Sequence, residues 1–182
     1  MGLDMFLRKR PKFSNDENVS DAICSFVTWI RSKMKFGDEC SYKDWCGRDY
    51  NDLPDTKSLV EALEKFPLDS FDEEEVGYWR KANAIHKWFV ENVQDGIDDC
   101  GMHRSVTKDD LLRLKNLCEK VLENHDLADK LLPSSAGFFF GNLEYDDIYF
   151  DKLQYTKELC AKLTEEDGFD FENYYLYYVT SW

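Results

Sequence analysis

The segment from residue 107 to residue 122 has the clearest pattern in the chain, and that pattern requires an amphipathic helix. Its apolar residues recur at intervals of three and four, which places them on one helical face: Leu111, Leu114, Cys118, Val121 and Leu122. Thr107 and Asp110 have the spacing of a capping box, which satisfies the first N–H groups of a helix. We therefore expect a helix here that buries this stripe.

Two helices are predicted on the N-terminal side of this segment. Ser14 and Glu17 have capping-box spacing, and the apolar residues that follow recur at helical intervals as far as Met34. A shorter helix begins at Thr56 and stops at Pro67, because proline cannot continue a helix.

Two further helices are predicted, over residues 76–93 and residues 145–164. The helix over residues 76–93 is expected to be the longest of the chain. Three carboxylates fall in or before its first turn, where negative charge suits the helix macrodipole: Glu73, Glu74 and Glu75.

Strands are expected near both ends of the chain and once between them. Residues 2–8 alternate in polarity with the period of a strand that Pro11 ends, and residues 171–180 are rich in aromatic residues. Residues 136–141 (AGFFFG) read as a short buried strand. The prediction is an α+β fold in one domain over residues 1–182, with about five helices packed on a small antiparallel sheet that includes the N- and C-terminal strands.

The charge of the chain is strongly negative. It contains 37 Asp and Glu residues against 23 Lys and Arg residues, a net charge of −14. Nucleic-acid binding through a broad basic face needs clustered cations, so direct nucleic-acid binding is not expected. No apolar run approaches the ~20 residues that span a bilayer, and no signal-peptide pattern opens the sequence. We expect no membrane association, a cytoplasmic location, and reduced thiols at all six cysteines.

The residues that come nearest to a catalytic or metal-binding set are His86, Cys100 and His103. A zinc site needs four ligands, or three and a water, and His86 also falls beside the apolar stripe of its predicted helix. The sequence therefore predicts no metal, no cofactor and no catalytic residue. A carboxylate pair for hydrolysis stays open, because one residue in five is acidic and any chosen pair is uninformative.

Acidic clusters are the strongest physical signal. They lie at residues 69–75, 95–99 and 144–172. Carboxylates at phosphate-like spacing can occupy the arginine and lysine channels of nucleic-acid enzymes, although most acidic surfaces only keep a protein in solution. Trp79 and Arg80 lie in a segment dense in aromatic and cationic groups, which suits either a recognition surface or inward packing.

The sequence also resembles a known family. The shared features are the opening GLDMFL, the block GYWRKANAIHKWFVENVQDGIDDC at residues 77–100, the LLP before GFFFG, and an acidic, aromatic helix followed by a Tyr-rich end. Together they are similar to a widespread family of small phage-encoded proteins that includes an anti-CRISPR inhibitor of type II-A Cas9.

The resemblance implies a phage anti-defence protein in the cytoplasm of the bacterial host. It would bind Cas9, or the Cas9–guide RNA complex, and interfere with DNA binding or cleavage without catalysis. A small hydrolase or nuclease-like phage enzyme, or a host-takeover protein that binds another basic host protein, are the alternatives. The candidate partner-binding residues are Asp69, Asp72, Glu73, Glu74, Glu75, Trp79, Arg80, Asp98, Asp99, Glu144, Tyr145, Asp146 and Asp147.

Overall fold

The computed structural model describes residues 2–36, 41, 44, 54–98, 100–101, 103–137 and 140–182. The contacts within the chain divide it into two compact units. Unit 1 comprises Met1–Arg8, Glu75–Phe171 and Leu176–Trp182, and unit 2 comprises Lys9–Glu74 and Glu172–Tyr175. The single domain over residues 1–182 stays a prediction.

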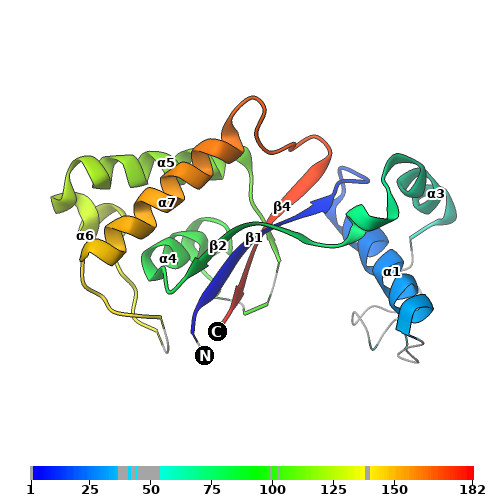
Figure 1. The fold of residues 1–182 in the computed structure, drawn as a ribbon, viewed down its shortest axis with the longest axis horizontal. Coiled ribbons are helices and arrows are strands. Elements are labelled where there is room, and N and C mark those ends of the chain that lie inside the picture. The colour runs from blue at the N-terminus through cyan, green and yellow to red at the C-terminus, as the bar shows by residue number, and fades with distance from the viewer. Residues whose placement is uncertain are drawn as a thin grey trace. The chain divides into compact units, whose positions relative to one another are not determined.

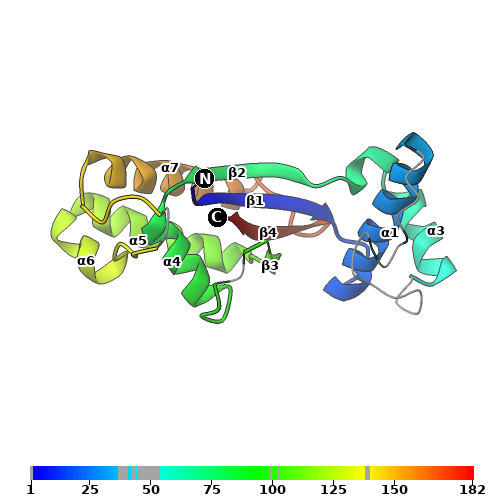
Figure 2. The same ribbon diagram turned by 90° about the horizontal axis from the view of Figure 1, so that it is seen from below.

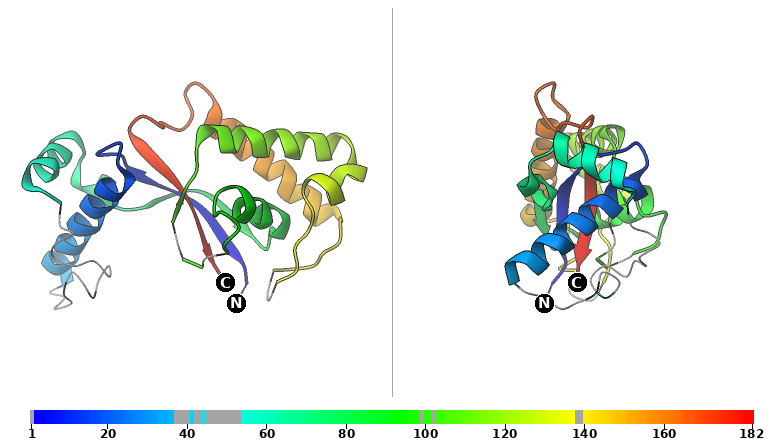
Figure 3. Two further views of the ribbon diagram at one scale, coloured as in Figure 1. Left: turned by 180° about the vertical axis from the view of Figure 1, so that it is seen from behind. Right: turned by 90° about the vertical axis from the view of Figure 1, so that its right-hand side faces the viewer.

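A sheet of four antiparallel strands contains segments from distant parts of the sequence (Figure 2). The order across the sheet is β2-β1-β4-β3. Strand β3 is short and pairs antiparallel with β4, so that Arg104 lies opposite Tyr178. The bounds are Asp4–Pro11 for β1, Glu74–Arg80 for β2, Arg104–Ser105 for β3 and Tyr174–Ser181 for β4. The predicted α+β fold with an antiparallel sheet that includes the N- and C-terminal strands is confirmed, and the two chain ends lie close together in every view (Figure 3).

The helices of unit 1 enclose a single apolar core with the strands. Helices α5 and α7 lie side by side (Figure 1). The core draws side chains from β1, β2, β4 and every helix of this unit, and its centre includes Phe89 stacked on Tyr178 with ring centroids 4.0 Å apart. The helical segments are α4 (Asn83–Asn92), α5 (Lys108–Glu123), η3 (His125–Leu127), α6 (Ala128–Leu131) and α7 (Asp147–Thr164).

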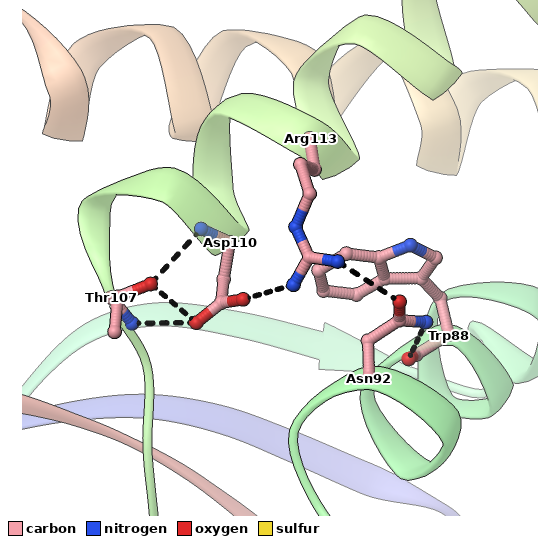
Figure 4. A network of polar contacts seen from close by, with 5 residues as sticks. All are labelled: Trp88, Asn92, Thr107, Asp110 and Arg113. Carbon is pink, nitrogen blue, oxygen red and sulfur yellow. Dashed lines mark hydrogen bonds and ion pairs between the residues drawn. The ribbon is translucent and has the colours of Figure 1, made fainter.

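Helix α5 begins at the predicted capping box, and a polar network extends from it to α4 (Figure 4). The Asp110 amide donates to the Thr107 hydroxyl (3.1 Å), and the Thr107 amide donates to the Asp110 carboxylate (2.9 Å). Arg113 bonds the same carboxylate and donates to the Asn92 side chain (3.4 Å). The guanidinium also lies over the Trp88 ring, 5.8 Å from its centroid.

Unit 2 contains α1 (Glu17–Phe36), α3 (Thr56–Lys65) and the short helix η2 (Leu68–Phe71). Its core is small: Ile23, Val27, Ala62, Phe66 and Phe71. The predicted cap of α1 is wrong. Asp16, rather than Ser14, precedes the helix and accepts a hydrogen bond from the Asn18 amide (2.9 Å), while Ser14 accepts one from the Asp16 amide (3.0 Å).

The predicted helix over residues 76–93 is wrong in its first part, which is strand β2. Gly77 and Trp79 are buried while Tyr78 and Arg80 are exposed, the two-residue alternation of a strand. The helix α4 starts only at Asn83. Val76 and Trp79 are three residues apart, so the apolar pattern alone fitted a helix as well. The carboxylates at residues 73–75 therefore do not lie in a helical first turn.

The predicted strand at residues 136–141 is also not supported where the structure describes it. Ala136, Gly137, Phe140 and Gly141 are outside any strand, and Phe138 and Phe139 lie outside the described residues. Phe140 is buried and packs edge-on against His86 instead. Among the helices of the described ranges, none has the length and apolar character needed to cross a bilayer.

Candidate functional site

The acidic run at residues 72–74 is paired with cations inside unit 2. Arg31 bonds Asp72 (2.9 Å), Lys9 bonds Glu74 (2.8 Å), and Arg10 bonds Glu73. Arg31 also donates to the backbone oxygen of Leu68 (2.9 Å), and this second bond helps to hold its guanidinium beside Asp72. These three carboxylates thus have structural partners, and their charge is partly neutralised within the unit.

Arg10 is the centre of the most buried of these ion pairs. It bonds both Asp21, which lies in α1, and Glu73, which directly precedes β2. Burial opposes its charge, but the two carboxylates outweigh that penalty and hold the pKa of the guanidinium above its ordinary value. Removing Arg10 would take away the ion pairs of two partly buried carboxylates at once. The side chain of Asp69 lies outside the described part of unit 2, whereas Glu75 is exposed in unit 1.

In unit 1, the surface between β2 and α7 forms an open groove of about 440 Å³. Its exposed apolar atoms come from Tyr78 (37% exposed), Ile148 (59%) and Tyr155 (42%). The Tyr155 hydroxyl accepts a long hydrogen bond from the Tyr78 amide (3.4 Å), which ties the helix to the strand. The full lining is Tyr78, Trp79, Arg80, Ile148, Asp151, Lys152 and Tyr155.

Of the two interpretations that the sequence left open for Trp79, the structure shows inward packing. The side chain is 3% exposed, and its indole N–H donates to the Thr156 hydroxyl (2.9 Å) inside unit 1. Its ring packs edge-on against Phe89 and Tyr155. Trp79 therefore forms the floor of the groove rather than an anchor on its surface.

Arg80 lies at one end of the groove with most of its side chain in solvent. Its guanidinium is 3.8 Å from the Asp4 carboxylate, which also accepts a hydrogen bond from the Tyr78 hydroxyl. That hydrogen bond raises the pKa of Tyr78, so the phenol stays protonated. Aromatic residues and arginine are the types most enriched at binding hot spots.

The predicted residues 144–147 gather at the start of α7. Asp146 caps the helix, because it accepts hydrogen bonds from the Tyr149 amide (2.9 Å) and the Asn142 side chain (3.0 Å). The Asn142 bond, followed by the backbone bond, lowers the pKa of Asp146. Tyr145 donates to Asp129 (3.4 Å). Glu144 and Asp147 are exposed, so they are the carboxylates of this group that face solvent.

Asp98 is exposed and contacts the buried His86, and Asp99 lies outside the described residues. His86 is enclosed in unit 1, with Nδ1 2.8 Å from the Tyr178 hydroxyl and Nε2 3.1 Å from the Asp98 carboxylate. Burial lowers the pKa of His86 and outweighs Asp98, which acts in the opposite direction. Neutral His86 satisfies both contacts when Tyr178 donates and Asp98 accepts.

In the part of the chain that is described, the cysteines are either buried thiols or lie next to backbone carbonyl oxygens. Burial raises the pKa of Cys24 and of Cys160 to about 12, so both are thiols at neutral pH. Cys100 is exposed, and its Sγ is 3.8 Å from the Thr180 and Trp182 carbonyl oxygens. Within the described ranges, no group of three His, Cys, Asp or Glu residues is placed to hold a metal ion.

Comparison with protein-family models, with curated proteins and with solved structures finds no match for this chain.

Sequence reasoning missed the groove between β2 and α7. Two signals for it were present in the sequence. One is the Tyr-Trp-Arg order at residues 78–80, and the other is the apolar residue Ile148 at the start of the last helix. The groove could not be found from them, because residues 76–80 were assigned to a helix and α7 was not known to lie beside them.

Proposed function

We propose that this protein acts by binding another protein, and that its partner is a type II-A Cas9 whose DNA binding or cleavage it inhibits. The observation that carries the proposal is an open aromatic groove with an exposed arginine on a chain of net charge −14. The resemblance of residues 77–100 to the phage family supplies the partner. Membership of that family is part of the same proposal, as is action in the cytoplasm of the bacterial host.

The groove supports specific binding because its two tyrosine rings offer apolar contact area and are already fixed in position. Tyr78 and Tyr155 are held by hydrogen bonds before any partner arrives, which lowers the entropy that binding must remove. Ile148 adds an exposed apolar side chain beside them. A partner side chain on this surface would contact the two tyrosine rings and Ile148, with Arg80 beside them.

The exposed carboxylates support recognition of a basic surface. Glu75, Glu144 and Asp147 are exposed in unit 1, and none of them caps a helix or forms a described ion pair. Cas9 holds nucleic acid in positively charged channels and reads its PAM with arginines. Negative charge on an approaching protein speeds encounter with such a surface, and arginines occupied by carboxylates are not free for phosphates.

The direct test measures cleavage of a matched DNA target by several type II-A Cas9 proteins, with and without the purified protein. Inhibition that saturates near one-to-one stoichiometry is expected. Turnover of DNA, RNA or Cas9 by catalytic amounts of the protein would favour the enzyme alternative. The absence of inhibition at micromolar excess across all the Cas9 proteins would refute the proposed partner.

The groove is tested separately by Ile148→Asp, which adds a charge to an exposed groove residue without disturbing the core. Inhibition should weaken through faster dissociation of the complex. Ile97→Asp is the matched control, because Ile97 is also exposed in unit 1 (57%) and does not line the groove. Equal inhibition by the two variants would remove the groove from the proposal.

The charges are tested by Glu144→Lys with Asp147→Lys, against Glu123→Lys with Asp126→Lys at the far end of α5. Both pairs change the net charge equally and replace exposed carboxylates. The first pair should slow association more than the second, and added salt should diminish the difference, because exposed charges are screened over ~8 Å at physiological ionic strength. Identical association rates would show that the acidic surface keeps the protein in solution and does not take part in binding.

A further inference from the structure

Strand β2 lies at the edge of the sheet, with β1 on one side and no described strand on the other (Figure 2). Successive residues of a strand point their N–H and C=O groups to opposite sides. The Lys81 amide, just after β2, donates to the Leu3 carbonyl oxygen just before β1 (2.7 Å). The main-chain groups of Arg80 and Tyr78 therefore point away from β1, toward the free edge.

The groove between β2 and α7 follows this edge. Residues 78–80, three in succession on the strand, all line it. Successive strand residues alternate between the two faces of a sheet, so a groove that contacts all three lies beside the strand and not over one face. Its opposite wall is α7, which contributes Ile148, Asp151 and Tyr155.

The shape of this groove suits an extended peptide segment. Between Ile148 and Tyr155, α7 advances by about 10 Å, which is the length of about three strand residues. Addition of an extended segment to a free sheet edge is a recurring form of peptide recognition, in which main-chain hydrogen bonds supply affinity and alternate side chains supply specificity.

Two main-chain groups at the edge are available to such a segment. The Tyr78 amide already donates to the Tyr155 hydroxyl (3.4 Å). The next groups along the edge are the Tyr78 carbonyl oxygen and the Arg80 amide, and no hydrogen bond between described residues reaches either of them. One extended residue can donate to the first and accept from the second, because its own N–H and C=O point to the same side. Tyr155 then keeps its hydrogen bond.

The charge in the groove that has no described ion pair is negative. Asp151 is exposed on the α7 wall. The two cations of the groove have contacts of their own, because Lys152 donates to a backbone carbonyl oxygen (2.7 Å) and the Arg80 guanidinium is 3.8 Å from a carboxylate. A basic side chain of an added segment would pair with Asp151. A residue two positions away, about 7 Å along the segment, would point to the same wall and would cover Ile148 or Tyr155 if it is apolar.

We propose that the partner enters this groove as an extended segment, which joins the sheet as an additional strand beyond β2. The segment carries a lysine or arginine beside Asp151 and an apolar residue two positions away, against Ile148 or Tyr155. The Tyr78 carbonyl oxygen and the Arg80 amide hold its backbone. The existence of a protein partner rests on the proposed function, to which this proposal adds the conformation and chemistry of the segment that is bound.

The first test needs no Cas9. Linear peptides of about eight random residues are selected by display on the immobilised full chain, and the best binder is synthesised with a methyl group on one backbone nitrogen at a time. Methylation removes an N–H donor, so affinity should fall about tenfold at alternate positions and change little at the positions between them. Hydrogen exchange of the Arg80 amide, followed by NMR, should slow in the complex.

Three results of this test would overturn the proposal. One is a set of methylation effects without a two-residue period. Another is an Arg80 amide that exchanges as fast in the complex as in the free protein. The third is failure to select any peptide whose binding is weakened by Ile148→Asp.

The second test compares Arg80→Pro with Arg80→Ala. Proline removes the N–H group that faces away from β1, and an edge position of this kind tolerates proline. Alanine removes the same side chain but keeps the N–H group, so it is the matched control. Arg80→Pro should bind the selected peptide about tenfold more weakly than Arg80→Ala. Equal affinities would overturn the proposal, and if Arg80→Pro does not fold, the exchange rate of the wild-type Arg80 amide decides.

The same variants separate the added strand from the identity of the partner. If Arg80→Pro and Arg80→Ala inhibit Cas9 equally well, the Cas9 partner stands and the added strand fails. If peptides bind with the two-residue period but no type II-A Cas9 is inhibited, the added strand stands and the Cas9 partner fails.

Discussion

The two units of this chain are stabilised by different interactions. Unit 1 has an extensive apolar core that draws on its strands and helices, whereas the core of unit 2 consists of five buried apolar residues and a few partly buried apolar neighbours. Around that small core, unit 2 places partly buried ion pairs, with Arg10 bonded to two carboxylates. A small core buries a smaller fraction of its surface, so a segment of this kind depends more on specific polar contacts.

This difference predicts which unit is more sensitive to salt. Apolar burial is insensitive to pH and is not weakened by salt, whereas exposed ion pairs such as Lys9–Glu74 are screened by salt. Unit 2 should therefore open locally before unit 1. The carboxylates at residues 72–74 form ion pairs within unit 2, which leaves the exposed carboxylates of unit 1 as the candidates for partner recognition.

The largest effect is expected from Phe89→Ala in unit 1. The substitution removes a ring stacked on Tyr178 and leaves a cavity, so the free energy of unfolding should fall by about 3–5 kcal/mol. Urea denaturation followed by tryptophan fluorescence measures it. Leu112→Ala on the exposed side of α5 is the control and should cost under about 1 kcal/mol. A small effect at Phe89 would show that the core of unit 1 is looser than its burial suggests.

The corresponding substitution in unit 2 is Arg10→Met, which keeps an apolar stem but removes the ion pairs of Arg10 with Glu73 and Asp21. We expect a loss of about 2–3 kcal/mol in the opening free energy of unit 2, measured by hydrogen exchange of the α1 amides. Lys57→Met breaks the exposed Lys57–Glu61 pair and should have almost no effect. Similar losses in the two variants would mean that the Arg10 pairs are no stronger than a surface pair.

A pH dependence is expected from His86 in unit 1. Its pKa is 6.5 when unfolded and is lowered by burial in the folded state, so the unfolded chain binds the proton more tightly. The stability contributed by neutral His86 is complete above pH 6.5. It falls as the pH drops from 6.5 toward the folded-state pKa, by at most about 1.4 kcal/mol per pH unit.

This slope is measured by urea denaturation at a series of pH values. The His86→Gln variant should lose the slope, and His125→Gln should keep it, because His125 is exposed and stacks on Phe150. A slope that survives His86→Gln would assign the proton uptake to another group.

The smallest effect is expected from Thr107→Ala, which removes the cap of α5. The Asp110 amide would lose its acceptor, and unit 1 should be destabilised by about 1 kcal/mol. The same denaturation experiment measures it, and Thr107→Ser is the control that keeps the hydroxyl. If Thr107→Ser is as unstable as Thr107→Ala, the methyl group rather than the capping bond is responsible.

Local patterns predicted the elements whose signals agree with one another. Helix α5 has a clear stripe and a capping box, and both appear in the structure. The strand predicted at residues 171–180 from its aromatic residues is β4, which begins three residues later, at Tyr174. The placement of N- and C-terminal strands in one sheet was also predictable, because chain ends often lie close together.

The rest depends on contacts between distant residues, which no local pattern contains. Residues 76–80 form a strand because β1 is beside them. Position 77 favours glycine because a Cβ there would lie only 2.6 Å from the Leu159 side chain. The acidic candidate residues were chosen by charge, and charge does not show which carboxylates have partners. Glu73 is bound by Arg10 and Asp146 caps a helix, whereas the sequence treats them like the exposed Glu144.

The strand order has a consequence for synthesis of the chain. Strand β4 lies between β1 and β3, yet it is the last of the four strands to be made. While the ribosome is still adding the residues of α7, β1 has a hydrogen-bonding edge with no neighbour, and the first strand must wait for the last. Such long-range pairing folds slowly. The nascent chain therefore carries an open strand edge until β4 emerges, and this is the period in which it is most exposed to aggregation and to chaperones.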